Sequence, residues 1–186
     1  TLYVCGPTVY NDSHLGHAKT YVSFDVILRY LKYRGFNTFY VQNITDVGHL
    51  MGDADEGEDK MLKRARELEL EPMAVAETYT TRHFQAMDRM GVIRADICPR
   101  ATGHIPEQLE AIEKMIEAGL AYEVNGSVYF DVSKDPEYGK LSNRSFEEMQ
   151  EGARVEVRQE KRNPQDFALW KKAEAGHLMR WRDSYS

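Results

Sequence analysis

The chain has 186 residues, of which 42% are hydrophobic and 29% are charged, and its formal net charge is −6 at pH 7. This composition excludes an intrinsically disordered chain, and the acidic balance argues against a module that coats nucleic acid through a strongly basic surface. No run of about 18 apolar residues is present, so we expect no membrane span. Because Cys5 and Cys98 are too few for a disulfide framework, we expect a reducing, cytoplasmic setting.

The first 45 residues predict a strand, a long helix and a second strand. An apolar stretch at residues 2–5 is followed by Asp12 and Ser13, either of which is a candidate N-cap for a helix over residues 14–33. The largely apolar stretch at residues 36–45 then reads as a strand. Strand–helix–strand units are nearly always parallel and right-handed. The pattern therefore predicts an α/β fold built on a parallel sheet.

Two further helices are predicted at residues 60–69 and 72–90, the second with Pro72 in its first turn. They follow an acidic segment at residues 52–60. The glycine and glutamate positions of this segment do not fit a calcium-binding loop. We interpret it as a solvated loop.

The pattern changes in the second half of the chain. A helix is expected at residues 106–118, and a hairpin at residues 121–132 carries an Asn-Gly pair typical of a type I′ turn. Residues 145–148 match a capping box at the start of a short helix. This mixture does not continue the parallel pattern, so we interpret residues 103–178 as an α+β insertion.

Chemistry-bearing residues gather at the end of the first predicted strand and at the start of the first helix. Cys5 and Gly6 close the strand, and two histidines flank Gly16 at the helix start. In open α/β sheets, ligands bind at the carboxyl ends of the strands. The backbone amides of a helix start suit an anion such as phosphate, imidazoles can donate to the same group, and a glycine leaves room for a flat base.

None of the usual phosphate-binding loops occurs in this sequence. Neither the P-loop pattern nor the dinucleotide-binding glycine pattern is present. A single histidine near a helix start is more often structural, although a pair around a glycine behind a Cys-Gly strand end is less readily explained by packing. A role of the pair in packing or capping alone therefore stays open.

The four residues His14, Leu15, Gly16 and His17 resemble the HIGH signature of class I aminoacyl-tRNA synthetases. Their surroundings are similar to the cysteinyl-tRNA synthetase family. The stretches that carry this similarity are CGPTVYNDSHLGHAKTYVSFDVILRYL, YVQNITDVGHL, DADEGEDK, RATGHI, GSVYFDV and NPQDFALWKK, which together run from residue 5 to residue 172.

The resemblance implies a fold and a reaction. The fold is the first half of a Rossmann-like parallel-sheet nucleotide-binding domain at residues 1–102, with a connective-peptide insertion at 103–178 and a return segment at 179–186. The reaction is the activation of cysteine by ATP, with Mg²⁺, to cysteinyl-adenylate, followed by transfer of the cysteinyl group to tRNA(Cys). It also implies a monomer.

The resemblance further implies roles for individual residues. Cys5 would be a ligand of Zn²⁺, which takes the substrate thiolate as a further ligand, and Gly6, Thr8 and Thr45 would lie near the bound cysteine. Zinc prefers sulfur to a hydroxyl oxygen, so such a metal would exclude serine. His14 and His17 would be catalytic and would stabilise charge on the ATP phosphates. The whole segment of His14, Leu15, Gly16 and His17 would bind ATP.

Several features of the family are missing from these 186 residues. In the family, the other three zinc ligands, a KMSKS-type loop and an anticodon-reading domain lie further along the chain. The resemblance thus implies an amino-terminal part of a longer enzyme, inactive by itself. Two alternatives remain: a cysteine ligase that acts on an amino-sugar, and a non-catalytic binding relic. We expect Cys98 to be a core thiol, and His83 to face the same cleft if its helix lies against it.

Overall fold

The computed structural model describes residues 1–48, 60–143, 161–173 and 179–182. These residues form two compact units, one that ends at residue 104 and one that begins at residue 105. The acidic segment before Lys60 and the predicted capping box at 145–148 lie outside the described residues. Within the described part, none of the helices has the length and apolar character that crossing a membrane would need.

The first unit is built on a parallel strand pair. Strand β1 (Leu2–Val4) pairs with β2 (Tyr40–Gln42) in parallel, and helix α1 (Leu15–Tyr33) connects them. This confirms the predicted α/β arrangement. The second strand is shorter than the stretch 36–45 that the sequence predicts, because Tyr40 is the first residue of that stretch to pair with β1.

A third stretch of chain extends this sheet beyond β2. Ile97 forms a parallel bridge with Val41, and Arg100 forms one with Ile44. On the other side, Thr8 bridges in parallel to Thr45 past the end of β1. The sheet therefore continues through single bridges where the sequence shows no strand pattern.

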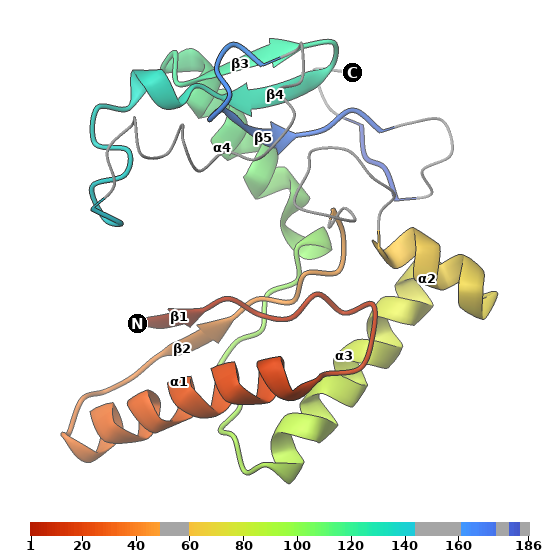
Figure 1. The fold of residues 1–186 in the computed structure, drawn as a ribbon, viewed down its shortest axis with the longest axis vertical. Coiled ribbons are helices and arrows are strands. Elements are labelled where there is room, and N and C mark those ends of the chain that lie inside the picture. Colours follow the sequence, from red (N-terminus) through yellow and green to blue (C-terminus); the bar gives the residue numbers. More distant parts are fainter. Residues whose placement is uncertain (49–59, 144–160, 174–178, 183–186) are drawn as a thin grey trace. The chain divides into compact units, whose positions relative to one another are not determined.

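One face of the β1–β2 pair is covered by two helices. Helix α3 (Pro72–Arg89) and helix α1 lie on the same side of the strands (Figure 1). Their shared core consists of Val4, Tyr21, Leu28, Tyr40 and Met87. On the opposite face, Tyr3 is 57% exposed among the described residues.

Helix α2 (Lys60–Leu68) packs on α3 through a second apolar cluster. Met61 and Ala65 of α2 meet Val75 of α3 and reach Val9 and Ile44 beside the strand ends. The ends of the predicted helices at 60–69, 72–90 and 106–118 differ from the observed ones by one residue each.

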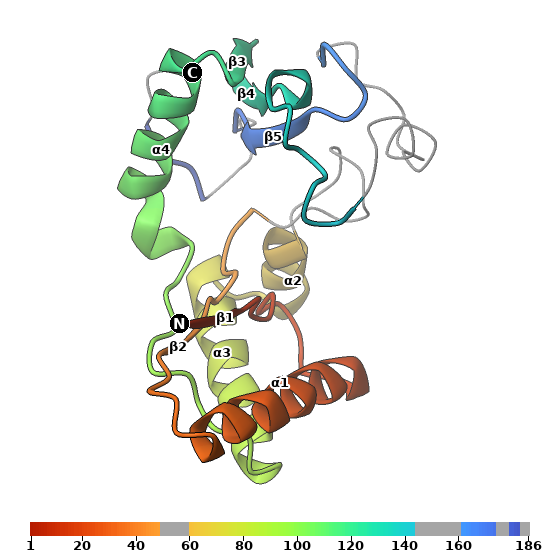
Figure 2. The same cartoon turned by 90° about the vertical axis from the view of Figure 1, so that its left-hand side faces the viewer.

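The described residues of the second unit combine an α-helix with an antiparallel sheet (Figure 2). Helix α4 (Ile105–Glu117) precedes β3 (Ala121–Val124) and β4 (Ser127–Phe130), and β5 (Phe167–Trp170) pairs on the far side of β4. Asn125 and Gly126 have φ values of 55° and 85°. This left-handed pair confirms the predicted type I′ turn.

The buried Asp166 ties the second unit together. Its carboxylate accepts hydrogen bonds from the Tyr122 hydroxyl at 2.6 Å and from the amides of Val132 and Asn163. A buried carboxylate needs such donors to offset its lost hydration. The role of this unit as an insertion stays a prediction.

Candidate functional site

At the start of helix α1, each of the two histidine rings accepts a hydrogen bond from a backbone amide. The Gly16 amide donates to Nδ1 of His14 at 3.0 Å, and the His14 amide donates to Nδ1 of His17 at 3.2 Å. His14 is therefore the N-cap, with extended backbone angles of φ −114° and ψ 180°. The predicted caps Asp12 and Ser13 are wrong, because their side chains bond to residues of α3 instead.

The glycine between the histidines has a local reason. A Cβ atom at Gly16 would stand 2.8 Å from Cε1 of His14, which is closer than side-chain carbons approach. Gly16 thus lets the His14 ring fold back over the helix start. Leu15, at the first helical position, is 85% exposed.

The cap fixes which nitrogen carries the proton in each ring. A ring nitrogen that accepts an amide hydrogen has no proton of its own, so in neutral His14 and His17 the proton is on Nε2. Burial, and then the nearby charge of His14, lower the pKa of His17 from its usual value. The neutral ring of His17 is therefore favoured, with its N–H donor on Nε2.

Aromatic side chains connect this helix start to α3. The ring centroids of His14 and His17 are 4.1 Å apart, His17 stacks on Tyr21 at 6.4 Å, and Tyr21 meets His83 edge-on at 5.2 Å. His83 is buried, and its Nδ1 lies 2.8 Å from the Ser13 hydroxyl. Burial, followed by the charge of His17, lowers the pKa of His83 to about 4.

Tyr21 also links the histidines to the predicted metal ligand. Its hydroxyl donates to the Cys5 carbonyl oxygen at 3.4 Å, and its pKa is raised, chiefly by burial. Cys5 follows the last residue of β1 and is an exposed free thiol. The structure therefore brings Cys5 and the histidine pair to one region of the first unit, around Tyr21.

The glycine after Cys5 permits a close approach of two chain segments. A Cβ atom at Gly6 would lie 1.4 Å from the carbonyl oxygen of Asn43, so no other residue fits there without movement. The Asn43 side chain accepts from the Gly6 amide at 2.8 Å and from the Tyr3 hydroxyl at 2.9 Å. Its amide group donates to the Thr45 hydroxyl at 3.0 Å.

Backbone bonds hold the other two predicted cysteine-site residues together. The Thr45 amide donates to the Pro7 carbonyl at 3.0 Å, the Val9 amide donates to the Thr45 carbonyl at 3.2 Å, and Thr8 lies opposite Thr45. Beyond Thr45, the fully buried Asp46 accepts from the amide and hydroxyl of Thr102. Hydrogen bonds thus fix the chain at Thr45 to the segment after β1, and at the next residue, Asp46, to Thr102.

Metal-ligand geometry is incomplete in the described part of the chain. No group of three or more His, Cys, Asp or Glu side chains there could hold a metal ion. Cys98, expected to be a core thiol, is half-buried against the cluster of Val9 and Met61. Burial raises the pKa of its thiol, which suits a packing role.

Sequence reasoning missed two residues that organise this region: Asn43 bridges the strand ends, and Tyr21 bridges Cys5 and the histidines. His83, which was expected to face the cleft if its helix lies against it, fastens the loop before α1 to α3. Tyr21 lies four residues after His17 on a helix, so this neighbour was readable from helical spacing. His83 and Asn43 are distant in the sequence, and their contacts depend on the tertiary fold.

Comparison with solved structures first defines the class of fold. The chain superposes on the LeuRS of Agrobacterium radiobacter K84, solved in a ternary complex with tRNA and LeuAMS, with a TM-score of 0.54 and 18% identity. That match covers 72% of this chain and 17% of the other. A Campylobacter jejuni protein described as an arginyl tRNA synthetase gives a TM-score of 0.52 at 13% identity, over 73% of this chain and 38% of that one. The chain therefore shares its fold with parts of these two synthetase structures.

The family within this class follows from the sequence. The family model of tRNA synthetases class I (C), catalytic domain, matches residues 1–186, and the chain belongs to this family. Proteins named cysteine--tRNA ligase from Chlorobaculum tepidum, Thermus thermophilus and Deinococcus radiodurans are 59%, 59% and 60% identical over 99–100% of the chain. The chain spans 37–39% of the length of these relatives.

Proposed function

We propose that this chain is part of a longer enzyme that activates cysteine with ATP and transfers it to tRNA(Cys). The observation that carries the proposal is that the free thiol of Cys5, directly after β1, and the histidine pair at the start of α1 lie around the same residue, Tyr21. The relatives of the chain are named cysteine--tRNA ligases. Mg²⁺ would accompany ATP, and the enzyme would act as a monomer in the cytoplasm.

The histidines are proposed to meet the ATP phosphates. With Nδ1 of each ring bonded to a backbone amide, the Nε2–H of each ring is the donor left for a ligand. Donors that are fixed before the reaction stabilise charge as it develops and need no reorganisation. His14 and His17 would thereby lower the barrier to the attack of the cysteine carboxylate on ATP, as pyrophosphate leaves.

Amino-acid selection is proposed for the strand ends. Gly6, Thr8 and Thr45 surround the Asn43 bridge and would line the cysteine site. Cys5 is an exposed thiol and fits one ligand position of a zinc site, whose other ligands would come from beyond the described residues. Bound zinc would supply a ligand position for the substrate thiolate. As a zinc ligand, Cys5 would then place the metal that selects cysteine close to the histidines.

The decisive experiment is ATP–pyrophosphate exchange by the longer protein, with cysteine or serine as the amino acid. We expect exchange with cysteine alone, and its loss in Cys5→Ser with the melting temperature unchanged. Cys98→Ser is the matched control, since it removes the other thiol of the chain, and it should keep exchange. Cysteine-dependent exchange at the normal rate in Cys5→Ser would overturn the role given to Cys5.

The acceptor is tested separately. After activation, tRNA(Cys) should receive the cysteinyl group, and an amino-sugar should not. Transfer to an amino-sugar alone would favour the related ligase, while the absence of any exchange would favour a binding relic. Each result therefore selects one of the three hypotheses.

A further inference from the structure

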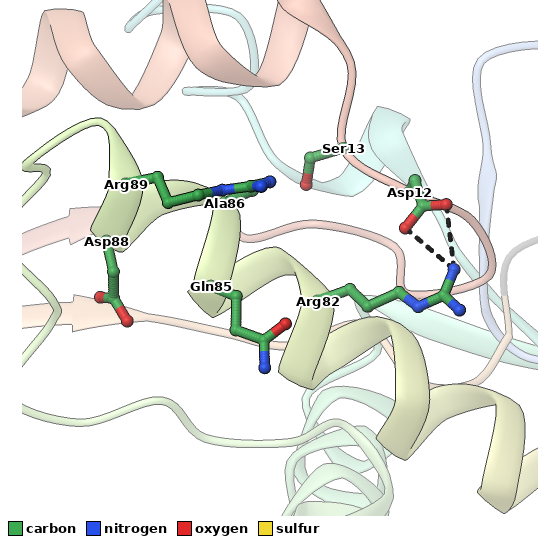
Figure 3. Close-up of a pocket in the computed structure, with 7 residues that line it drawn as sticks. All are labelled: Asp12, Ser13, Arg82, Gln85, Ala86, Asp88 and Arg89. Atoms are coloured by element: carbon green, nitrogen blue, oxygen red, sulfur yellow. Dashed lines mark hydrogen bonds and ion pairs between the residues drawn. The ribbon is translucent and has the colours of Figure 1, made fainter.

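A pocket with several charged residues in its lining lies beside the helix start, on the side of α3. This open pocket, of about 630 Å³, has two walls. One is the loop at Asp12 and Ser13, which directly precedes the histidine pair, and the other is a face of α3 (Figure 3). The lining residues from α3 are Arg82, Gln85, Ala86, Asp88 and Arg89.

Of the charged residues in this pocket, some have a partner of opposite charge among the described residues and one does not. Asp88 is held by Arg94 through two contacts of 2.5 and 2.8 Å, and its pKa is lowered mainly by these bonds. Arg89 has no hydrogen-bond or ion-pair partner within the described residues, and its side chain extends toward Ser13 (Figure 3). The pocket therefore contains a cation that no carboxylate of the described residues neutralises.

The second arginine is held only weakly. Arg82 donates to the two carboxylate oxygens of Asp12 at 3.2 and 3.4 Å, and both side chains are more than half exposed. Such exposed pairs contribute about 0–1 kcal/mol, so an incoming anion can compete for Arg82. Arg82 also lies over the Tyr79 ring at 5.3 Å, which keeps the guanidinium near the pocket.

This arrangement suits phosphate groups. Guanidinium groups bind phosphate through paired N–H donors, and the pocket is open enough for a chain to pass across it. Arg82 and Arg89 are seven residues apart on one helix, a rise of about 10 Å. That separation exceeds the width of one phosphate group and fits two phosphates of a single strand.

We propose that Arg89 and Arg82 form a phosphate-binding subsite for the RNA backbone, next to the histidine pair. The inference rests on the proposed function, because that function supplies the RNA. Arg89 is free to bind a phosphate without giving up another partner among the described residues. Arg82 binds a second phosphate once that phosphate has displaced Asp12. RNA bound here would run along α3 past Ser13 and so approach the start of α1.

The test measures binding of a tRNA(Cys) transcript to the longer protein across a salt series. Arg89→Gln should weaken binding by about three- to tenfold near physiological salt and reduce the slope of log K against log salt by about 0.7–0.9. Arg89→Lys keeps the charge and should retain most of the affinity. The matched control is Arg34→Gln, which removes one exposed arginine of the same unit at the far end of α1 and should change neither quantity.

A gain of affinity tests the weak ion pair. Asp12→Asn removes the competitor for Arg82, so it should tighten RNA binding by about two- to fivefold and steepen the salt slope. Arg82→Gln should cancel this gain in the double variant. Melting temperatures check that each variant is folded.

Two results would overturn the proposal. One is an unchanged affinity and salt slope in Arg89→Gln, and the other is an Arg89→Gln effect on the KM for ATP without an effect on RNA binding, which would assign the pocket to the nucleotide. Pyrophosphate exchange needs no RNA, so failure of the proposed function would appear there independently of these binding measurements.

Discussion

His14 and His17 are bound through Nδ1 to the backbone at the start of α1, and this leaves Nε2 as their outward donor. One pair of side chains can therefore cap a helix and offer two hydrogen bonds to a ligand. The two roles can be separated by substitution, because asparagine is a good N-cap but lacks an imidazole donor.

We expect His14→Ala and His17→Ala to lower the rate of cysteine activation by roughly 10²–10³-fold each, as for the loss of one preorganised donor. The KM for cysteine should stay nearly constant. His14→Asn should restore the melting temperature of the protein but not the rate. The measurement is kcat in pyrophosphate exchange with ATP saturating. Full activity in His14→Asn would leave the histidine with a capping role only.

The buried His83 gives the protein a dependence of stability on pH. Its pKa is about 4 in the folded chain and near 6.5 in the unfolded chain. Between these values the unfolded state binds a proton that the folded state does not, so stability falls as pH falls from about 6.5 to about 4. The loss is at most about 3 kcal/mol.

We expect this acid sensitivity to shrink in His83→Gln. Urea unfolding at pH 7.5 and pH 4.5 should show a smaller difference in unfolding free energy for the variant than for the parent chain. Comparing the two proteins removes the shared contribution of the carboxylates. Equal differences in both would mean that His83 does not stay neutral on folding.

At the scale of elements, the end of β1 depends on a close approach between backbone segments. Gly6 lies against the Asn43 carbonyl, and the Asn43 side chain holds Gly6, Tyr3 and Thr45. The positions of the proposed cysteine site therefore follow from the way the residues after β1 fit those after β2.

We expect Gly6→Ala to destabilise the first unit by more than about 2 kcal/mol, because an added Cβ would overlap the Asn43 carbonyl oxygen and force the backbone to move. Gly103→Ala is the matched control, since a Cβ there meets nothing within 4 Å. Denaturant unfolding measures both variants. A Gly6→Ala protein as stable as the Gly103→Ala protein would refute this account of the strand ends.

At the scale of the whole molecule, the described residues contain part of the proposed chemistry. Cys5 fits one zinc ligand position, and no set of three ligating side chains is found among the described residues. A tetrahedral zinc site needs four ligands. The affinity of the 186-residue chain for the metal should therefore be far lower than that of the longer protein.

We expect the 186-residue chain to bind Zn²⁺ no better than micromolar and to show no pyrophosphate exchange, while the longer protein holds about one zinc per chain. Metal analysis after dialysis against a chelator distinguishes these cases. Stoichiometric, chelator-resistant zinc in the 186-residue chain would contradict the assignment of the other ligands to the longer protein.

Much of the local structure follows from patterns within a few residues of each other. The bounds of the four described α-helices were predicted to within one residue from apolar spacing and from start and stop residues such as Pro72, and the Asn125-Gly126 turn was predicted from its residue pair. The bridges of Ile97 to Val41 and of Arg100 to Ile44, and the pairing of β5 with β4, were not predicted. Such pairings join distant segments, and short strands have little periodicity of their own to reveal them.

The sequence alone determined the family and the α/β class. It also indicated that Cys5 and Gly6 lie near the two histidines that flank Gly16. These conclusions depend on residue identity and local spacing. Only the tertiary structure decided that His14 caps α1 in place of Asp12 or Ser13. That choice depended on partners brought by α3, since Arg82 and His83 engage the two rival side chains. The same packing placed Tyr21 between the histidines and Cys5, and it opened the arginine pocket beside them. Contacts between distant segments cost chain entropy and form only when the core is assembled, so no local pattern encodes them.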